Sequence, residues 1–268
     1  MRHALAAAAA RFASATPRLD AELLMAHALG VSREAMLLRW LDDPAPSTFA
    51  ALADRRAAHE PVAYIIGTRA FWTIDLAVAP GVLIPRADSE TLIEAAVAHF
   101  AGTAGPRRVL DLGTGSGALL LAALDEWPCA SGVGLDASDA ALAVAGGNVG
   151  RLGCAHRAHV RSGDWSGTNE AFDLVLCNPP YVAAGTVLPD EVARYEPAGA
   201  LFAGPDGLDD YRRIAPILRA QIAPGGVACI EIGADQGEAA GALFRARGLS
   251  VACRRDLAGR DRCLVVSP

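Results

Sequence analysis

The sequence Asn-Pro-Pro-Tyr at positions 178–181 directly follows a buried, strand-like run at 174–177. Two prolines cannot continue a β-ladder or begin an ordinary helix there. One explanation is a rigid turn. The other is a binding site, because open α/β sheets place their ligands at the carboxyl ends of strands. The side-chain oxygen of Asn178 and the backbone carbonyl of Pro179 could hold the two N–H groups of a planar NH₂ group, and Tyr181 could stack on it.

A second candidate site lies in the loop after the strand-like run 108–112. This loop reads Gly-Thr-Gly-Ser-Gly at 113–117 and follows Asp111. Its glycines allow a tight turn and the close approach of a ligand. Asp136 closes the next strand, where a carboxylate can accept hydrogen bonds from two ribose hydroxyls. Asp-x-Gly-x-Gly-x-Gly followed by such an acid resembles the S-adenosylmethionine site of class I methyltransferases; the alternative is a tight turn plus a surface aspartate.

Asp164 and Trp165 end the third strand of the same region. An acid there can accept the amino group of adenine, and an indole can pack on the ring. Taken alone, the pair is also explained by a helix cap and a core aromatic residue. Its place in the sheet is what favours a role in binding.

The Asn-Pro-Pro-Tyr residues suit methyl transfer to nitrogen. The nitrogen of a planar amide or base NH₂ group is a weak nucleophile because its lone pair is delocalised. Two acceptors on its N–H groups would hold it and favour the build-up of charge, and the prolines fix one acceptor at little entropic cost. A sulfonium methyl donor has a good leaving group, so positioning carries much of the rate and no strong base is needed.

Composition excludes several classes of partner. The 268 residues include 24 basic and 30 acidic side chains, and this length allows one or two domains. Residues 1–88 are balanced, with nine arginines and nine acids, whereas residues 89–268 have fifteen arginines and twenty-one acids. An acidic half is a poor match for nucleic acid. No apolar run reaches the roughly eighteen residues of a membrane span, so no membrane is expected either.

The six cysteines form no Cys-x-x-Cys pair and no disulfide framework, which favours a reducing cytoplasm. Cys154, His156 and His159 lie close together in sequence. No carboxylate or second cysteine completes a tetrahedral site there, so no metal is expected.

The elements that position these residues fall into three stretches. Residues 1–70 have helical periodicity, with Gly30 as a helix stop. Residues 71–88 alternate as a β-hairpin, with a turn at Pro80-Gly81. Residues 89–268 alternate between helices and strands, which predicts a mostly parallel sheet. The last two strands are joined by only a short loop, which fits an antiparallel pair. The fold class is therefore α/β: a Rossmann-like sheet, preceded by a small helical bundle and a β-hairpin linker.

Asn-Pro-Pro-Tyr is shared by adenine-N6 and glutamine-amide methyltransferases, and its flanking stretches separate them. The combination resembles the peptide chain release factor glutamine methyltransferases, on residues 61–67, 82–86, 195–197, 206–208, 231–233 and 259–262. There is one departure. Where that family usually has Pro-Glu-Thr-Glu, this chain has Ala87-Asp88-Ser89-Glu90. We expect the missing proline to affect the local hinge of the backbone more than the chemistry.

The resemblance implies a monomeric, cytoplasmic, class I enzyme. It would transfer a methyl group from S-adenosyl-L-methionine to the glutamine of the Gly-Gly-Gln motif in release factors and leave S-adenosyl-L-homocysteine. Residues 1–70 would be a helical substrate-recognition domain, 71–88 a linker and 89–268 the methyltransferase domain. Cofactor contacts would be Asp111, Gly113, Thr114, Gly115, Ser116, Gly117, Asp136, Asp164, Trp165 and Asn178. Asn178, Pro179, Pro180 and Tyr181 would bind the substrate, with Asn178, Pro179 and Tyr181 acting in catalysis.

Three alternatives remain at this stage. One is the related glutamine methyltransferase that acts on a ribosomal large-subunit protein; residues 61–67 and 86–90 resemble the release factor enzymes more. Another is an adenine-N6 methyltransferase, which predicts a basic face that the charge distribution does not favour. The third is a non-catalytic adaptor, against which the intact glycine loop and Asn178 both argue.

Overall fold

The computed structural model describes residues 1–268 and divides into two units. The helical unit consists of Met1–Thr68 and Leu188–Glu196, and the sheet unit consists of Arg69–Val187 and Pro197–Pro268. The chain thus passes between the units three times. The segment Leu188–Glu196, an excursion from the middle of the sheet unit's sequence, belongs to the helical unit. Hydrophobic periodicity did not predict this.

The helical unit is built from short helices around an apolar core. The core includes Leu5, Phe12, Leu24, Met25, Met36, Phe49 and Ile65. Gly30 ends the second helix at a φ of +68°, as expected, because only glycine adopts this conformation at low cost. The Ser32 hydroxyl accepts a hydrogen bond from the backbone N–H of Ala35 at 3.1 Å and caps the third. The helices are α1 (Arg2–Ala9), α2 (Pro17–Leu29), α3 (Arg33–Arg39), α4 (Phe49–Ala57), α5 (Val62–Ile66) and α9 (Asp190–Ala193).

The excursion Leu188–Glu196 is held within the helical unit by polar contacts. Arg56 is buried and pairs with Asp20 at 2.9 Å and with Glu191 at 2.7 Å. The Tyr195 hydroxyl donates to the backbone carbonyl of Ala58 at 2.8 Å. Short helix α9 and these contacts together keep the excursion folded against the helices that lie far earlier in the sequence.

The hairpin is present, but its turn was predicted at the wrong place. Strands β1 (Thr68–Phe71) and β2 (Ile74–Ala77) pair across a two-residue turn at Trp72 and Thr73, not at Pro80-Gly81. Trp72 adopts a φ of +54°, the left-handed conformation that tight hairpin turns require. Its backbone N–H donates to the Glu90 carboxylate at 2.9 Å, so a tertiary contact stabilises a turn that the residue types do not suggest.

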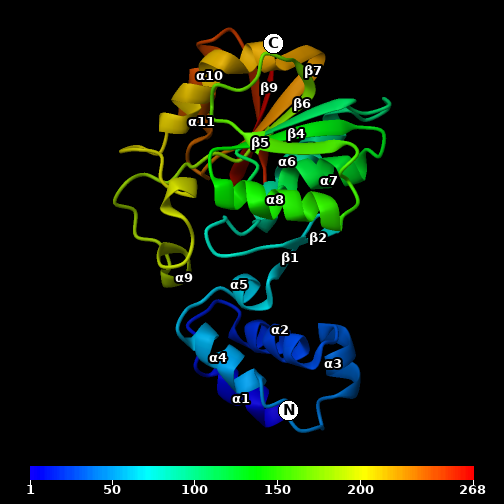
Figure 1. Ribbon diagram of the computed structural model, residues 1–268. Coiled ribbons are helices and arrows are strands. Elements are labelled where there is room, and N and C mark those ends of the chain that lie inside the picture. Colours follow the sequence, from blue (N-terminus) through cyan, green and yellow to red (C-terminus); the bar gives the residue numbers. More distant parts are fainter. The chain divides into compact units, whose positions relative to one another are not determined.

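The sheet unit contains one seven-stranded sheet in the order β5-β4-β3-β6-β7-β9-β8 (Figure 1). Neighbouring strands are parallel except at β9, which is antiparallel to β7 and to β8. The predicted mostly parallel sheet with an antiparallel last strand is confirmed. The strands are β3 (Arg108–Leu112), β4 (Ser131–Asp136), β5 (Ala158–Ser162), β6 (Phe172–Cys177), β7 (Ile222–Glu231), β8 (Ser250–Arg255) and β9 (Asp261–Ser267).

Helices cover both faces of this sheet, and alternate residues of each strand point to opposite faces. Val109 of β3 packs in one apolar cluster with α6 and α7, whereas Leu110 packs in a second cluster with α10 and α11. This two-sided burial explains why the strands read as continuous apolar runs. The helices of the unit are α6 (Glu90–His99), α7 (Ala118–Glu126), α8 (Asp139–Arg151), α10 (Asp209–Gln221) and α11 (Gly237–Arg245), with 3₁₀ turns η1 (Ala87–Ser89) and η2 (Ala198–Ala200).

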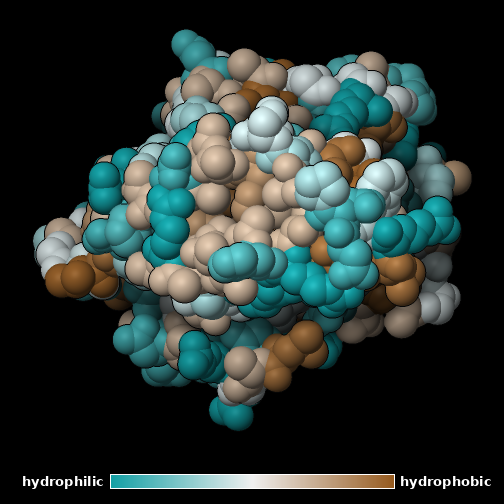
Figure 2. All heavy atoms as spheres, turned by 90° about the horizontal axis from the view of Figure 1, so that it is seen from below, coloured by the Kyte–Doolittle hydropathy of each residue, from teal (hydrophilic) through white to brown (hydrophobic).

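None of the helices combines the length and the apolar character that crossing a bilayer requires. On the face shown in Figure 2, the most hydrophobic residues occur in small, separated groups around a central area of moderately hydrophobic ones. Scattered hydrophobic residues of this kind are normal on protein surfaces.

Candidate active site

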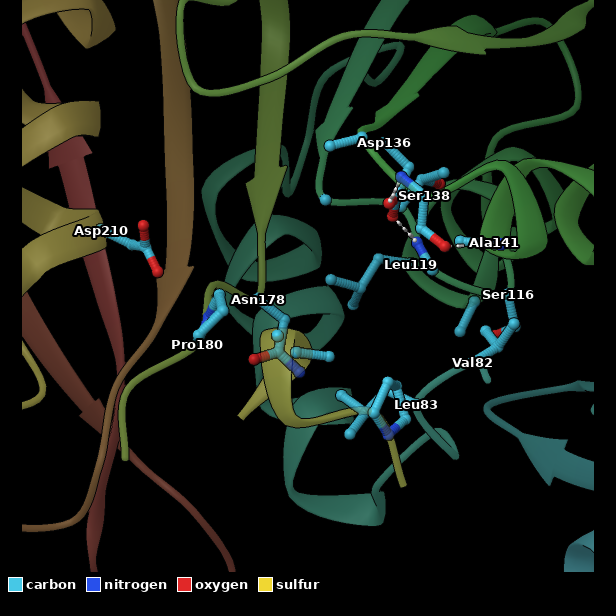
Figure 3. Close-up of a pocket in the computed structure, with 18 of the residues that line it drawn as sticks. Val82, Leu83, Ser116, Leu119, Asp136, Ser138, Ala141, Asn178, Pro180 and Asp210 are labelled. Carbon is cyan, nitrogen blue, oxygen red and sulfur yellow. Dashed lines mark hydrogen bonds between the residues drawn. The ribbon is translucent and has the colours of Figure 1, made fainter. Parts of the chain in front are cut away.

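A cavity of about 540 Å³ opens at the carboxyl ends of the central strands of the sheet unit (Figure 3). This size suits a small organic ligand. The residues predicted from the sequence that line it are Gly113, Thr114, Gly115, Ser116, Asp136, Asp164, Trp165, Asn178 and Pro180. Predicted residues that do not line it are Asp111, Gly117, Pro179 and Tyr181. The fold thus brings four separate loops together around one space.

The glycine loop between β3 and α7 needs its glycines for two different reasons. Gly113 and Gly115 have φ values of +73° and +56°, which side chains disfavour. A Cβ atom on Gly113 would lie 2.8 Å from the Trp165 ring, so that residue must be small for the indole to pack against the loop. A Cβ atom on Gly115 would meet nothing within 4 Å. The backbone of Gly115 therefore borders open space that a ligand can occupy.

Asp111 supports this loop from inside the protein. Its Oδ2 accepts hydrogen bonds from the Thr114 hydroxyl at 2.7 Å and from the Leu120 backbone N–H at 3.2 Å, while Oδ1 has no partner. Burial raises the pKa of Asp111 to about 7, although these two hydrogen bonds oppose the shift. The residue lies below the loop rather than in the cavity.

Asp136 is the last residue of β4 and faces the cavity (Figure 3). Its two oxygens accept backbone hydrogen bonds from Gly115 at 2.8 Å and from Ser138 at 2.9 Å. A carboxylate oxygen can accept more than one hydrogen bond. Asp136 is therefore held in one orientation and keeps acceptor capacity for a pair of hydroxyl groups.

Asp164 and Trp165 form the wall of the cavity after β5. The Ser166 hydroxyl and backbone N–H both donate to Asp164, and these bonds lower the pKa of its carboxyl, so it stays ionised. The Trp165 indole hydrogen-bonds to Asp210, and burial raises the pKa of that acid. The ring of Trp165 is thus held between the glycine loop and α10.

Asn178 and Pro180 lie beside the cavity at the end of β6 (Figure 3). The Asn178 amide nitrogen Nδ2 donates to the Ser89 hydroxyl at 3.2 Å. Its oxygen Oδ1 is therefore the atom left to accept a hydrogen bond from a ligand. The bond from Nδ2 to Ser89 thus fixes the direction in which Oδ1 points.

Tyr181 points away from the cavity into the protein. Its hydroxyl donates to Glu231 Oε1 at 3.1 Å, and burial raises the pKa of this phenol well above its ordinary value. The ring therefore stays neutral at every physiological pH. Glu231 is itself buried, with Oε2 unpaired, and burial raises the pKa of its carboxyl to about 7.

Several residues that line the cavity could not be identified from the sequence. Ser89, Asp210 and Arg213 add polar groups, and Val82, Leu83 and Phe202 add apolar ones. Val82, Leu83 and the Asp-Asp-Tyr-Arg-Arg stretch at 209–213 fall in or beside motifs that carried the resemblance, but no periodicity or spacing gave them a place in a site. Loops contribute them from distant parts of the sequence, which only the folded chain brings together.

No group of three or more His, Cys, Asp or Glu side chains is arranged to hold a metal ion. The cavity is instead lined by the carboxyl groups of Asp136, Asp164 and Asp210, the indole of Trp165 and the amide of Asn178. Such a set suits an organic cofactor that carries both hydroxyl groups and a heterocycle.

Two family models match the chain. The model described as the PrmC N-terminal domain matches residues 3–67, and that described as the methyltransferase small domain matches residues 88–194. The release factor glutamine methyltransferase of Rhodospirillum rubrum is 43% identical over 256 residues, which is 93% of this chain and 78% of that protein. The protein of the same name from Cereibacter sphaeroides is 44% identical over 270 residues, covering 97% and 95% of the two chains.

Solved structures add evidence on the fold. The crystal structure of a ribosomal protein L11 methylase from Lactobacillus delbrueckii subsp. bulgaricus matches with a TM-score of 0.52 at 19% identity, covering 71% of this chain and 83% of that one. At this identity the likeness concerns the fold alone.

Proposed function

We propose a specific reaction from one premise: the chain belongs to the release factor glutamine methyltransferase family. The family inferred from the motifs is thereby confirmed, and the chain is a protein-(glutamine-N5) methyltransferase. We propose that it transfers a methyl group from S-adenosyl-L-methionine to the side-chain amide nitrogen of the glutamine in the Gly-Gly-Gln motif of peptide chain release factors. S-adenosyl-L-homocysteine is the second product.

The direction of the Asn178 amide carries this proposal. Because Nδ2 is bonded to Ser89, Oδ1 is free to accept an N–H of the target amide. The backbone carbonyl of Pro179 is the second acceptor that we assign, held by two rigid proline rings. A planar NH₂ group gripped by two acceptors has its nitrogen fixed in position, and positioning of this kind can supply a large part of a rate enhancement.

The cavity residues fit the cofactor that the family uses. When bound, S-adenosylmethionine supplies an electrophilic methyl group on a sulfonium sulfur. We assign the glycine loop at 113–117 to the methionine and ribose parts of the cofactor. We assign Asp136 to the ribose hydroxyls, and Asp164 with Trp165 to the adenine. The observations that support these roles are the open space at Gly115 and the fixed Asp136 carboxylate with acceptor capacity to spare.

We assign no general base. Tyr181 is kept protonated, since burial raises its pKa. The acids that line the cavity are Asp136, Asp164 and Asp210, and we give the first two to the cofactor and the third to Trp165. The proton of the methylated amide leaves to water, which is adequate because the reaction's leaving group is already good.

We propose that residues 1–70 hold the large protein substrate, that 71–88 link the parts and that 89–268 carry out the transfer. A monomer that acts in the cytoplasm, where release factors work, is part of this proposal. The support is the match of residues 3–67 to a domain model specific to this family.

The test is methyl transfer from isotopically labelled S-adenosylmethionine. Unmethylated release factor, ribosomal subunits and duplex DNA are offered separately, and the labelled residue is mapped by mass spectrometry. Label on the Gly-Gly-Gln glutamine is the expected result. Label only on a ribosomal protein or on DNA would overturn the proposed substrate, and no label on any of the three would favour a non-catalytic role.

A further inference from the structure

A buried carboxyl group lies directly behind the Asn-Pro-Pro-Tyr residues. Strands β6 and β7 are parallel neighbours, and Cys177 is paired in register with Ile230. The next residues along the two strands, Asn178 just beyond β6 and Glu231 as the last residue of β7, therefore lie side by side. Glu231 has no exposed surface, and none of the roles assigned above uses it.

Two hydroxyl groups connect Glu231 to both ends of the substrate motif. The Tyr181 hydroxyl donates to Oε1 at 3.1 Å. The Ser89 hydroxyl also acts as a hydrogen-bond partner of this carboxyl and lowers its pKa. Ser89 in turn accepts the N–H of Asn178 at 3.2 Å. The first and last residues of the motif are thus both connected to one carboxyl group, Asn178 through Ser89 and Tyr181 directly.

Charged residues lie near the carboxyl of Glu231, but none forms a salt bridge with it. Arg262 is buried and donates to the backbone carbonyl of Ile232 at 3.2 Å, and it pairs with Asp88 and Asp256, each at 3.2 Å. Burial raises the pKa of Glu231, the nearby Arg262 charge lowers it, and Asp88 raises it. Because Glu231 forms no salt bridge, its carboxyl group is left to the hydroxyl groups of Tyr181 and Ser89.

We propose that Glu231 is a positioning residue for methyl transfer: it orients Ser89, and through Ser89 it selects the orientation of the Asn178 amide that presents Oδ1 to the substrate. The proposal rests on the function proposed above. It assigns a role to a residue that does not touch the substrate.

The physical reason lies in the single proton of the Ser89 hydroxyl. An asparagine amide can be turned so that either its oxygen or its NH₂ group faces the substrate. When the Ser89 proton is directed to Glu231, the Ser89 lone pairs face Asn178 and select its NH₂ group. Without that acceptor, the Ser89 proton can go to Asn178 Oδ1. The amide would then turn its NH₂ group toward the substrate NH₂, and two donors would face each other.

The kinetic test uses Ser89→Ala, Ser89→Thr and Glu231→Gln with the release factor as substrate. Ser89→Ala and Glu231→Gln should each lower kcat about tenfold, the scale of one net hydrogen bond, with the KM for S-adenosylmethionine changed much less. The double variant should be no worse than the poorer single one, because both changes act on the same chain of bonds. Ser89→Thr keeps the hydroxyl and should recover most of the turnover lost in Ser89→Ala.

Tyr211→Phe is the matched control. Tyr211 is a buried phenol whose hydroxyl donates to the backbone carbonyl of Glu231 at 2.9 Å, not to its carboxyl. Removing this hydroxyl disturbs Glu231 but leaves its carboxyl group and the hydrogen bonds of Ser89 and Asn178 in place. The kcat should therefore stay within about twofold of the wild type. Unchanged kcat in Ser89→Ala and Glu231→Gln, or an equal loss in Tyr211→Phe, would overturn the proposal.

A second measurement keeps this inference separate from the identity of the substrate. The side-chain NH₂ signals of Asn178 in a ¹⁵N spectrum, assigned by their loss in Asn178→Asp, report on its bond to Ser89 in the free protein. We expect them to shift in Ser89→Ala and in Glu231→Gln but to remain in place in Tyr211→Phe. If the wild type leaves the release factor unmethylated, the proposed function fails, and these signals still decide the inference. Unshifted signals in Glu231→Gln overturn it.

Discussion

Buried Glu22 in the helical unit and buried Asp111 and Glu231 in the sheet unit are held in opposite ways. In the helical unit, burial raises the pKa of Glu22, but hydrogen bonds from Arg18 and Arg33 outweigh it and the net shift is downward. In the sheet unit, Asp111 and Glu231 have no arginine in direct contact, and the pKa of each rises to about 7. The helical unit uses charge pairs to hold its helices together. The sheet unit instead contains buried carboxyl groups, each with one oxygen that has no hydrogen-bond partner.

The comparison teaches that buried polar groups serve different purposes in one chain. Breaking a pair in the helical unit should cost stability and spare the chemistry. Removing a polar group at the cavity should cost turnover and spare stability, a pattern expected where a site keeps groups for a ligand rather than for its own fold.

The largest effect on stability is expected at Arg56. Arg56→Met leaves the buried Asp20 carboxylate and Glu191 without their partner, and loss of one member of a buried pair costs about 3–5 kcal/mol. Urea unfolding of the full chain measures it. Arg11→Met is the control: the side chains of its pair with Asp54 are 51% and 66% exposed, and such a pair contributes at most about 1 kcal/mol. Equal costs in the two variants would break the comparison.

Asn178→Ala should show the reverse pattern. We expect kcat to fall about a hundredfold, as when one transition-state hydrogen bond is lost in a water-excluded site. Binding of S-adenosylhomocysteine, measured by calorimetry, and the free energy of unfolding should change far less. Unchanged turnover would refute the role of the amide as a clamp.

The third prediction concerns the pH dependence of stability at Asp111. Its folded pKa of about 7 lies above the ordinary 3.8, so the stability linked to its neutral form is complete below about pH 4 and is lost as pH rises toward 7. Asp111→Asn does not ionise. Between pH 5 and 7 the variant should therefore gain about 2 kcal/mol relative to the wild type. Urea titrations at both pH values give the difference; a constant difference would show that Asp111 is already ionised at pH 5.

The smallest effect separates two glycines of one loop. Gly113→Ala and Gly115→Ala both place a side chain at positive φ, which costs each about 1 kcal/mol. Only the new Cβ on Gly113 would meet the Trp165 ring, at 2.8 Å. Thermal unfolding of the free protein should show that Gly113→Ala is about 1 kcal/mol less stable than Gly115→Ala. Equal stabilities would mean that the ring moves aside freely.

Much of the sheet unit could be predicted from local pattern. The strand Arg108–Leu112 has the predicted bounds, and the strand Phe172–Cys177 contains the predicted run 174–177, because continuous apolar runs are local signals. The hairpin turn was misplaced because Trp72 takes a left-handed conformation that a contact with Glu90 stabilises. Nothing in the residue types at 72–73 signals that contact.

The sequence by itself determined the family, the class of reaction and the residues around the cavity that belong to motifs, since glycine spacing, strand-end acids and Asn-Pro-Pro-Tyr are all read within a few positions. Only the tertiary structure decided that Leu188–Glu196 belongs to the helical unit, that Tyr181 turns inward, and that Ser89 and Glu231 meet behind Asn178. These depend on which strand ends lie side by side and on how deeply a carboxyl is buried. Residues far apart in the chain set both, and no local pattern encodes them.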